Sequence, residues 1–120
     1  MPALPRLLGL LTAAYGLLIT VHPRSLARPC GLTDARDEVS PAVRVLVGGI
    51  GVRDAAIGGA MLLAPRGPAL RAAVAARVVA DASDAVVFGT GLPERDRRLR
   101  IAGFALGWAA LCALSGRWTG

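Results

Sequence analysis

Four long apolar runs make up most of this sequence, and they constrain its fold more than any other feature. They cover about residues 3–21, 41–64, 69–89 and 99–115, so that each holds 17 to 24 residues. A helix of that length is long enough to cross a hydrocarbon core of roughly 30 Å. The sequence therefore predicts an all-α, integral membrane bundle of four transmembrane helices, with residues 1–120 forming one multi-pass domain in the cell membrane.

The composition favours the same interpretation. Hydrophobic residues are 54% of the chain, whereas aromatic residues are only 4%, so the apolar content is mainly Ala, Val and Leu. A soluble domain of this length could not bury so much apolar surface without leaving large patches exposed to water. The lipid bilayer is therefore the first partner that the sequence predicts.

The chain is basic, with a formal net charge of +6, and its 14 basic residues are all Arg. A strongly basic chain can indicate nucleic-acid binding. Here the arginines lie between or inside the apolar runs rather than along one polar stripe, so no nucleic-acid partner is expected. An excess of Arg in short loops is instead typical of a membrane topology signal.

Three polar segments separate the apolar runs. Residues 23–40 are predicted to form a loop, residues 65–68 a tight turn, and residues 94–100 a charged turn, while Ser40 and Pro41 begin the second helix. The first and third segments carry seven Arg, against four on the opposite side of the predicted membrane. This bias predicts that both termini lie outside the cytoplasm.

Small residues recur at helical spacing in two of the predicted helices. In the second helix they are Gly51, Ala55, Gly58 and Gly59. The fourth helix has a G-x-x-x-G pattern between Gly103 and Gly107. Such stripes let helix backbones approach closely in lipid, either within the chain or between copies of it, so a homo-oligomer stays open as an alternative.

Five charged residues lie in the middle of the predicted transmembrane helices. They are Arg53 and Asp54 in the second helix, and Arg77, Asp81 and Asp84 in the third. Asp54 lies 11 residues before Pro65, and Arg77 lies 9 residues after Pro68. At ~1.5 Å per residue both are roughly 14–17 Å from the turn, near the mid-plane of a bilayer.

The helical wheel predicts which of these charges meet. Arg77, Asp81 and Asp84 follow an i, i+4, i+7 spacing and share one face. Asp54 lies beside the small residues of its helix, whereas Arg53 is about 100° further round and is expected to point at a different neighbour. An ionised side chain at this depth costs roughly 2.5–3.5 kcal/mol, so these residues must face one another or an internal cavity.

Two further residues are predicted to line such a cavity. Tyr15 is near the middle of the first helix, and Trp108 lies deep in the fourth. We therefore expect both to contact a bound substrate. Because two mid-membrane arginines face three aspartates, the least costly state has one Asp protonated, and this predicts an acid beside a fixed Arg.

The spacing of charges and glycines in the two central helices carries a resemblance. The residues that carry it are Arg44, Gly48, Gly51, Arg53, Asp54, Gly58, Pro65, Arg66, Gly67, Arg77 and Ala80 through Asp84. This pattern resembles a family of short four-helix integral membrane proteins of bacteria and fungi that is catalogued as a domain of unknown function. The resemblance implies the fold and no activity.

Three functions are compatible with buried charges of this kind. They can fix helix register in a structural or accessory subunit, carry protons, ions or a solute, or perform acid–base catalysis. The enzyme that we predict is an isomerase, a cyclase or an epoxide-opening enzyme acting on a lipophilic small molecule.

The catalytic roles predicted for that enzyme follow from the shared face of the third helix. Asp81 or Asp84 would be the acid and the other carboxylate the base, and Arg77 and Arg53 would hold charge in place. Asp54 is a further candidate for the catalytic site. No C-x-x-C pair, His/Cys cluster, phosphate loop or serine elbow occurs in the sequence, so no cofactor and no metal ion are expected.

Overall fold

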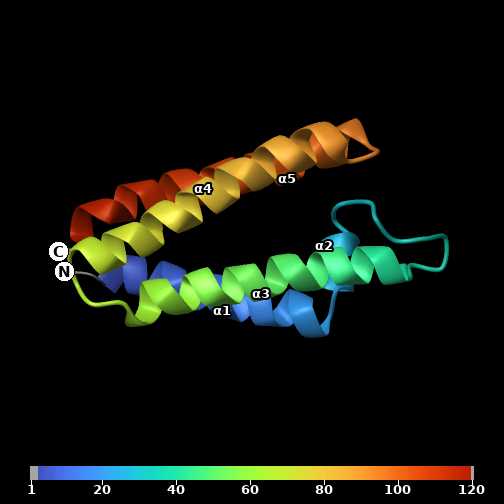
Figure 1. Cartoon of the computed structure of the whole chain (residues 1–120). Helices are drawn as coiled ribbons and strands as arrows, with labels where there is room; N and C mark the ends of the chain where they lie inside the picture. The colour runs from blue at the N-terminus through green and yellow to red at the C-terminus, as the bar shows by residue number, and fades with distance from the viewer. Residues whose placement is uncertain (1–2, 120) are drawn as a thin grey trace.

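The computed structural model describes residues 3–119, and this part of the chain is built of helices (Figure 1). The α-helices are α1 (Ala3–Val21), α2 (Arg24–Ala27), α3 (Pro41–Leu63), α4 (Pro68–Gly91) and α5 (Arg95–Ser115), followed by the 3₁₀ helix η1 (Gly116–Trp118). Within the described residues no strand forms, and the only β-type pairing is one isolated bridge between Thr33 and Val39.

Three of the four long helices are long and apolar enough to cross a membrane: α1, α3 and the segment Arg95–Trp118 that contains α5. The fourth, α4, is equally long, but four charged residues interrupt its apolar sequence. They are Arg71, Arg77, Asp81 and Asp84. Many large apolar side chains of the long helices are exposed in the isolated chain, among them Leu17, Val45, Val86 and Phe104. A surface of this kind suits lipid better than water.

Two of the predicted helix boundaries are wrong. The predicted loop of residues 23–40 contains α2, a single helical turn whose Leu26 and Ala27 are buried. The last long helix begins at Arg95 and not near Leu99, because the charged residues after Pro93 form its first turn. Hydropathy marks where a helix becomes apolar, and a helix can start earlier among charged residues that remain in water.

Helices α1 and α3 pack along a seam of glycines. A Cβ built on Gly16 would lie 2.5 Å from the carbonyl oxygen of Gly51, and one built on Gly58 would lie 2.5 Å from that of Gly9. Each helix contributes two glycines seven residues apart, so both stripes face the same way over two turns. The backbones therefore approach more closely than any side chain at these positions would allow.

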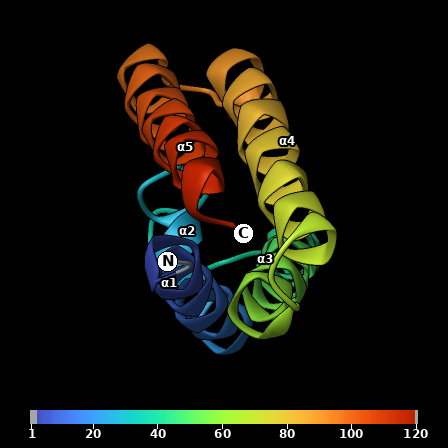
Figure 2. The ribbon, with the colours of Figure 1, turned by 90° about the vertical axis from the view of Figure 1, so that its left-hand side faces the viewer.

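The chain folds into two helix pairs that diverge from one end. Helix α1 packs mainly against α3, and α4 mainly against α5, and the pairs separate toward the end that carries α2 (Figures 1 and 2). At the opposite end, η1 contacts α1, α4 and α5, and the amide of Gly67 donates a 2.7 Å hydrogen bond to the carbonyl oxygen of Thr119. This end of the bundle is thereby closed.

The interior has three layers along the helix axes. One apolar cluster surrounds Met61 and Val74 near the closed end, and a second surrounds Val47 and Phe88 near the diverging end. Asp54 lies seven residues from both Val47 and Met61 on α3, so the polar residues occupy the layer between the clusters.

The G-x-x-x-G pattern of the last helix has no partner within the described chain. Nothing lies within 4 Å of a Cβ built on Gly103 or Gly107, whereas Gly51 and Gly58 of α3 are in close contact with α1. The predicted packing role of small residues therefore holds for the seam between α1 and α3, and the α5 pattern faces outward.

Candidate active site

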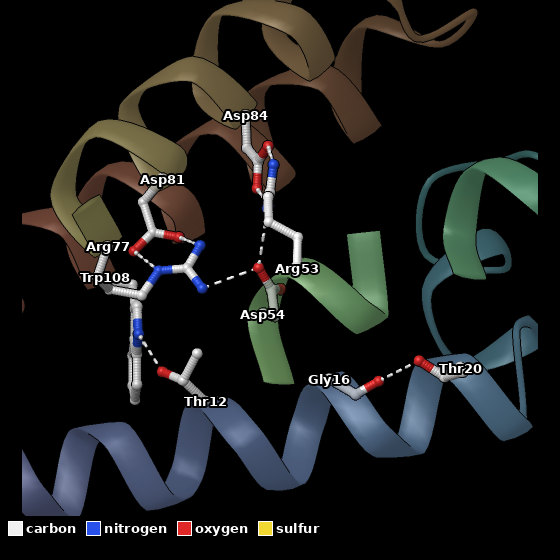
Figure 3. Close-up of polar contacts among 9 residues, drawn as sticks. All are labelled: Thr12, Gly16, Thr20, Arg53, Asp54, Arg77, Asp81, Asp84 and Trp108. Carbon is white, nitrogen blue, oxygen red and sulfur yellow. Dashed lines mark hydrogen bonds and ion pairs between the residues drawn. The ribbon is translucent and has the colours of Figure 1, made fainter. Parts of the chain in front are cut away.

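The middle layer brings together all five of the charged residues that the sequence singles out. Helices α3 and α4 run antiparallel from the turn at residues 64–67, so positions equally far from the turn lie side by side. As a result Arg53 and Asp54 on α3 face Arg77, Asp81 and Asp84 on α4 (Figure 3). The predicted register of these charges on α3 and α4 therefore agrees with the structure.

Arg77 is the most buried member of the network, with 2% of its surface exposed. Its Nη2 and Nε donate to the two oxygens of Asp81, at 2.6 and 3.1 Å, in a two-point ion pair along α4. Its Nη1 donates to Oδ1 of Asp54 across the gap to α3, at 2.8 Å. A charge-assisted pair of this kind fixes the plane of the guanidinium as well as its position.

Arg53 makes a second two-point pair, and this corrects the expectation that it points at a different neighbour. Its Nη1 and Nη2 donate to the two oxygens of Asp84 on α4, at 3.0 and 2.6 Å. Its Nε and Nη2 also donate to Oδ1 of Asp54, at 3.2 and 3.0 Å. The long Arg side chain reaches round the helix, so the wheel angle of its Cα does not decide where its charge lies.

Asp54 is shared by both arginines through a single oxygen atom. All three N–H groups that bind this carboxylate donate to Oδ1 (Figure 3). Within residues 3–119 no group donates to Oδ2, although the side chain is only 9% exposed. Asp81 and Asp84 differ, because each engages both oxygens with a guanidinium. Asp54 is therefore the carboxylate with an oxygen available to a ligand.

A cavity of about 200 Å³ adjoins this network. Four charged side chains form part of its wall: Asp54, Arg77, Asp81 and Asp84. Apolar and aromatic side chains form most of the remainder, namely Leu11, Leu26, Ile50, Phe88, Ile101, Phe104, Ala105 and Trp108. A concave, largely apolar site with a few converging polar groups is the usual form of a small-molecule binding site.

Tyr15 and Trp108, which the sequence predicts to bind substrate, both line this cavity. The indole Nε1 of Trp108 donates a 3.2 Å hydrogen bond to Oγ1 of Thr12, which joins α5 to α1 across the cavity. Within the described residues the Tyr15 hydroxyl has no hydrogen-bond partner. It is thus a polar group that a bound molecule can use.

Sequence reasoning missed Phe104 and Phe88 as cavity residues. Phe104 precedes Trp108 by one helical turn, and their rings stack with centroids 6.4 Å apart and planes inclined by 10°. The i, i+4 spacing of two aromatic residues in a chain with few of them was the available signal. Phe88 lies one turn beyond Asp84, on the charged face of α4, and could have been found from that spacing.

The described residues also bear on two other kinds of site, a metal centre and a reactive thiol. No group of three or more His, Cys, Asp or Glu residues within residues 3–119 is placed to hold a metal ion. Cys30, in the loop after α2, is buried, and this burial raises the pKa of its thiol to about 11. That thiol is therefore un-ionised at neutral pH and a poor nucleophile.

Comparison with known proteins gives no relative for this chain. No family model, no curated protein and no solved structure matches it. The family resemblance described above thus stays a prediction, and any function must be argued from the residues of the middle layer.

Proposed function

We propose that this chain is a multi-pass membrane protein in which all four long helices cross the bilayer. The three apolar helices support this, together with the position of α4 between α3 and α5. The mid-helix charges of α4 turn toward α3, where Arg53 and Asp54 pair with them. A helix with such charges can lie in lipid when its polar groups are satisfied by a neighbouring helix.

The proposed activity is cofactor-free acid–base catalysis on a lipophilic small molecule in the cavity. The observation that carries this proposal is that Asp54 lines an apolar cavity while two arginines bind only one of its two oxygens. Arg pairs that simply fixed helix register would not need a cavity, nor a carboxylate that remains partly unpaired.

In this mechanism Asp54 exchanges a proton with the substrate through Oδ2. As an acid it donates the proton to a substrate carbon or oxygen, and as the resulting carboxylate it removes a proton from a neighbouring carbon. Arg53 and Arg77 stabilise the carboxylate form through Oδ1, and Asp81 and Asp84 hold the two guanidinium groups in position. Because only Asp54 keeps an oxygen that no guanidinium engages, we assign the proton exchange to Asp54 in place of Asp81 and Asp84.

The proton balance limits the reactions available. Isomerisation and cyclisation return the proton to Asp54 and give a product of the same mass as the substrate. Opening of an epoxide adds one water molecule and gives a diol. All three reactions agree with a site that holds a proton donor among apolar walls and supplies no group for transfer.

The test compares the parent protein with Asp54→Asn in membrane vesicles supplied with a lipid extract of the cells in which the gene occurs naturally. Mass spectrometry should show a lipid-soluble product of one of two kinds. An isomer or a cyclised product keeps the substrate's mass and gains carbon-bound deuterium in D₂O, and a diol gains one water whose oxygen comes from the solvent. Asn has nearly the shape of Asp but carries no transferable proton, so we expect the product to be absent with Asp54→Asn. Identical product profiles from the two proteins would overturn the proposal.

Asp84→Asn is the matched control for this experiment. Asp84 belongs to the same network, but both of its oxygens bind Arg53. We expect Asp84→Asn to reduce turnover partially and not to abolish it. Should Asp54→Asn fail to fold, retained turnover in Asp84→Asn would still support Asp54, and loss of all turnover in Asp84→Asn would contradict it.

A further inference from the structure

The cavity has an excess of negative charge. The five residues of the network carry two guanidinium groups and three carboxylates. Among residues 3–119 no other charged side chain lines the cavity. When every carboxylate is ionised, one negative charge is therefore left without a cation. An uncompensated charge in a buried site is costly, so a proton or a positively charged ligand group must balance it.

Aromatic rings line the same cavity as this negative charge. Asp54 is one of its charged lining residues, and Tyr15, Phe88, Phe104 and Trp108 contribute rings to the lining. The faces of aromatic rings attract a cation, most strongly when water is excluded. A carboxylate oxygen and several aromatic rings around one cavity are typical of a binding site for an organic cation.

The cavity also has a side opening that suits an apolar molecule. Leu11 and Tyr15 of α1 and Phe104 of α5 line the cavity, and yet they are 47%, 39% and 69% exposed. One side-chain hydrogen bond, from Trp108 to Thr12, joins α1 to α5 within the described residues, whereas ion pairs close the side between α3 and α4. The opening between α1 and α5 therefore faces the surroundings of the bundle through apolar side chains.

We infer that this cavity binds a lipophilic cation, an apolar body with one positively charged centre placed against Oδ2 of Asp54 and the surrounding aromatic rings. This inference rests on the proposed function, because it names the class of substrate for that activity. The substrate is a neutral alkene or epoxide that becomes positively charged when it accepts the proton of Asp54. A stable ammonium ion resembles that charged form and binds in its place.

The protonation step balances for an alkene. The O–H bond of Asp54 breaks, its proton forms a C–H bond with the electron pair of the double bond, and the adjacent carbon becomes positive. The negative charge left on Asp54 then faces the new positive charge. Removal of a proton from a neighbouring carbon by the same carboxylate gives an isomer and restores the acid.

The test measures binding and needs no turnover. The protein is placed in zwitterionic nanodiscs with Trp118→Phe, so that Trp108 is the remaining tryptophan and reports on the cavity; Trp118 does not line it. The probes are adamantyltrimethylammonium and its neutral isostere, in which carbon replaces the nitrogen. We expect the ammonium ion to change the fluorescence of Trp108 at a concentration at least roughly tenfold lower than the isostere does.

Three variants test whether the preference for the ammonium ion over its isostere comes from residues that line the cavity. Asp54→Asn should weaken ammonium binding by at least roughly tenfold and leave the isostere unchanged. Phe104→Leu should reduce the preference several-fold through loss of a ring. Glu38→Gln, which removes an exposed carboxylate from the loop before α3, should change neither probe. Equal binding of the two probes in the parent protein would overturn the inference even if Asp54→Asn does not fold.

The outcome separates this inference from the proposed function. A preference for the ammonium ion without any turnover of the lipid extract would leave a cation-binding cavity and remove the enzyme. Turnover that depends on Asp54 without such a preference would keep the enzyme and remove the cationic substrate class.

Discussion

Helix α3 has two interfaces that are held in different ways. Toward α1 it presents glycines, and the two backbones touch along a seam without any ion pair. Toward α4 it presents Arg53 and Asp54, whose ion pairs lie beside a cavity and between two apolar clusters. The interface with α1 is packed too closely to hold a ligand. The interface with α4 leaves a cavity beside its charged side chains. One face of α3 is thus given to close helix packing, and the next carries the residues to which we assign the proposed chemistry.

The comparison predicts that loss of one charge from the ion pairs between α3 and α4 will lower the stability of the protein more than any other change. Arg77→Ala leaves the buried carboxylates of Asp54 and Asp81 without their shared cation. We expect the free energy of unfolding in detergent to fall by about 3–5 kcal/mol. The double variant Arg77→Met with Asp81→Leu should lose less than Arg77→Ala alone, because fewer charges are stranded. An Arg77→Ala protein as stable as the parent would mean that the network does not hold α3 to α4.

The glycine seam can be tested with a single methyl group. Gly58→Ala places a Cβ against the backbone of Gly9 and Ala13, which cannot move aside without separating α1 from α3. We expect a loss of about 2 kcal/mol in the free energy of unfolding. The neighbouring Gly59→Ala is the matched control, because nothing lies within 4 Å of its Cβ.

Gly59→Ala should raise stability slightly, since alanine favours a helix over glycine by about 1 kcal/mol. If Gly58→Ala lowers the free energy of unfolding and Gly59→Ala raises it in the same detergent, the close contact with α1 lies on one face of α3. The same sign and size at both positions would show that α1 and α3 are not in close contact there.

The smallest effect concerns the weakly joined side between α1 and α5. Thr12→Val removes the hydroxyl that accepts the Trp108 indole N–H while keeping the volume of the side chain. We expect a loss of about 1 kcal/mol and a shifted emission maximum of Trp108. Thr90→Val is the control, because Thr90 is exposed and bonds only to its own helix. A Thr12→Val protein with parental stability and emission would show that this bond does not join the two helices.

The sequence predicted the polar layer more accurately than the helix boundaries. Hydrocarbon does not tolerate single charges, so Asp54, Arg77 and Asp81 had to meet, and counting residues from the turn placed them level, whereas the pairing of Arg53 with Asp84 was not expected. Hydropathy, in contrast, did not predict α2 or the charged first turn of α5, because it detects apolar stretches and these segments are polar or short.

For the close approach of α1 and α3, the sequence analysis recognised the glycines of only one of the two helices. The glycines of α3 stood out as a stripe, but Gly9 and Gly16 of α1 were not recognised as their counterparts. A spacing of seven residues repeated in two helices is visible in the sequence. Which two helices join through such spacings depends on how all of them pack, and the unpartnered glycines of α5 show that the pattern alone does not decide it.

By itself the sequence determined that this chain forms long apolar helices and that five charges must gather in one layer between them. The lengths of the runs and the cost of a buried charge are properties of local sequence and solvent, so they need no coordinates. The tertiary structure alone decided that Asp54 keeps an open oxygen while Asp81 and Asp84 do not. That depends on how far two arginines reach and how far the helix pairs diverge, and both are set by the packing of the whole bundle.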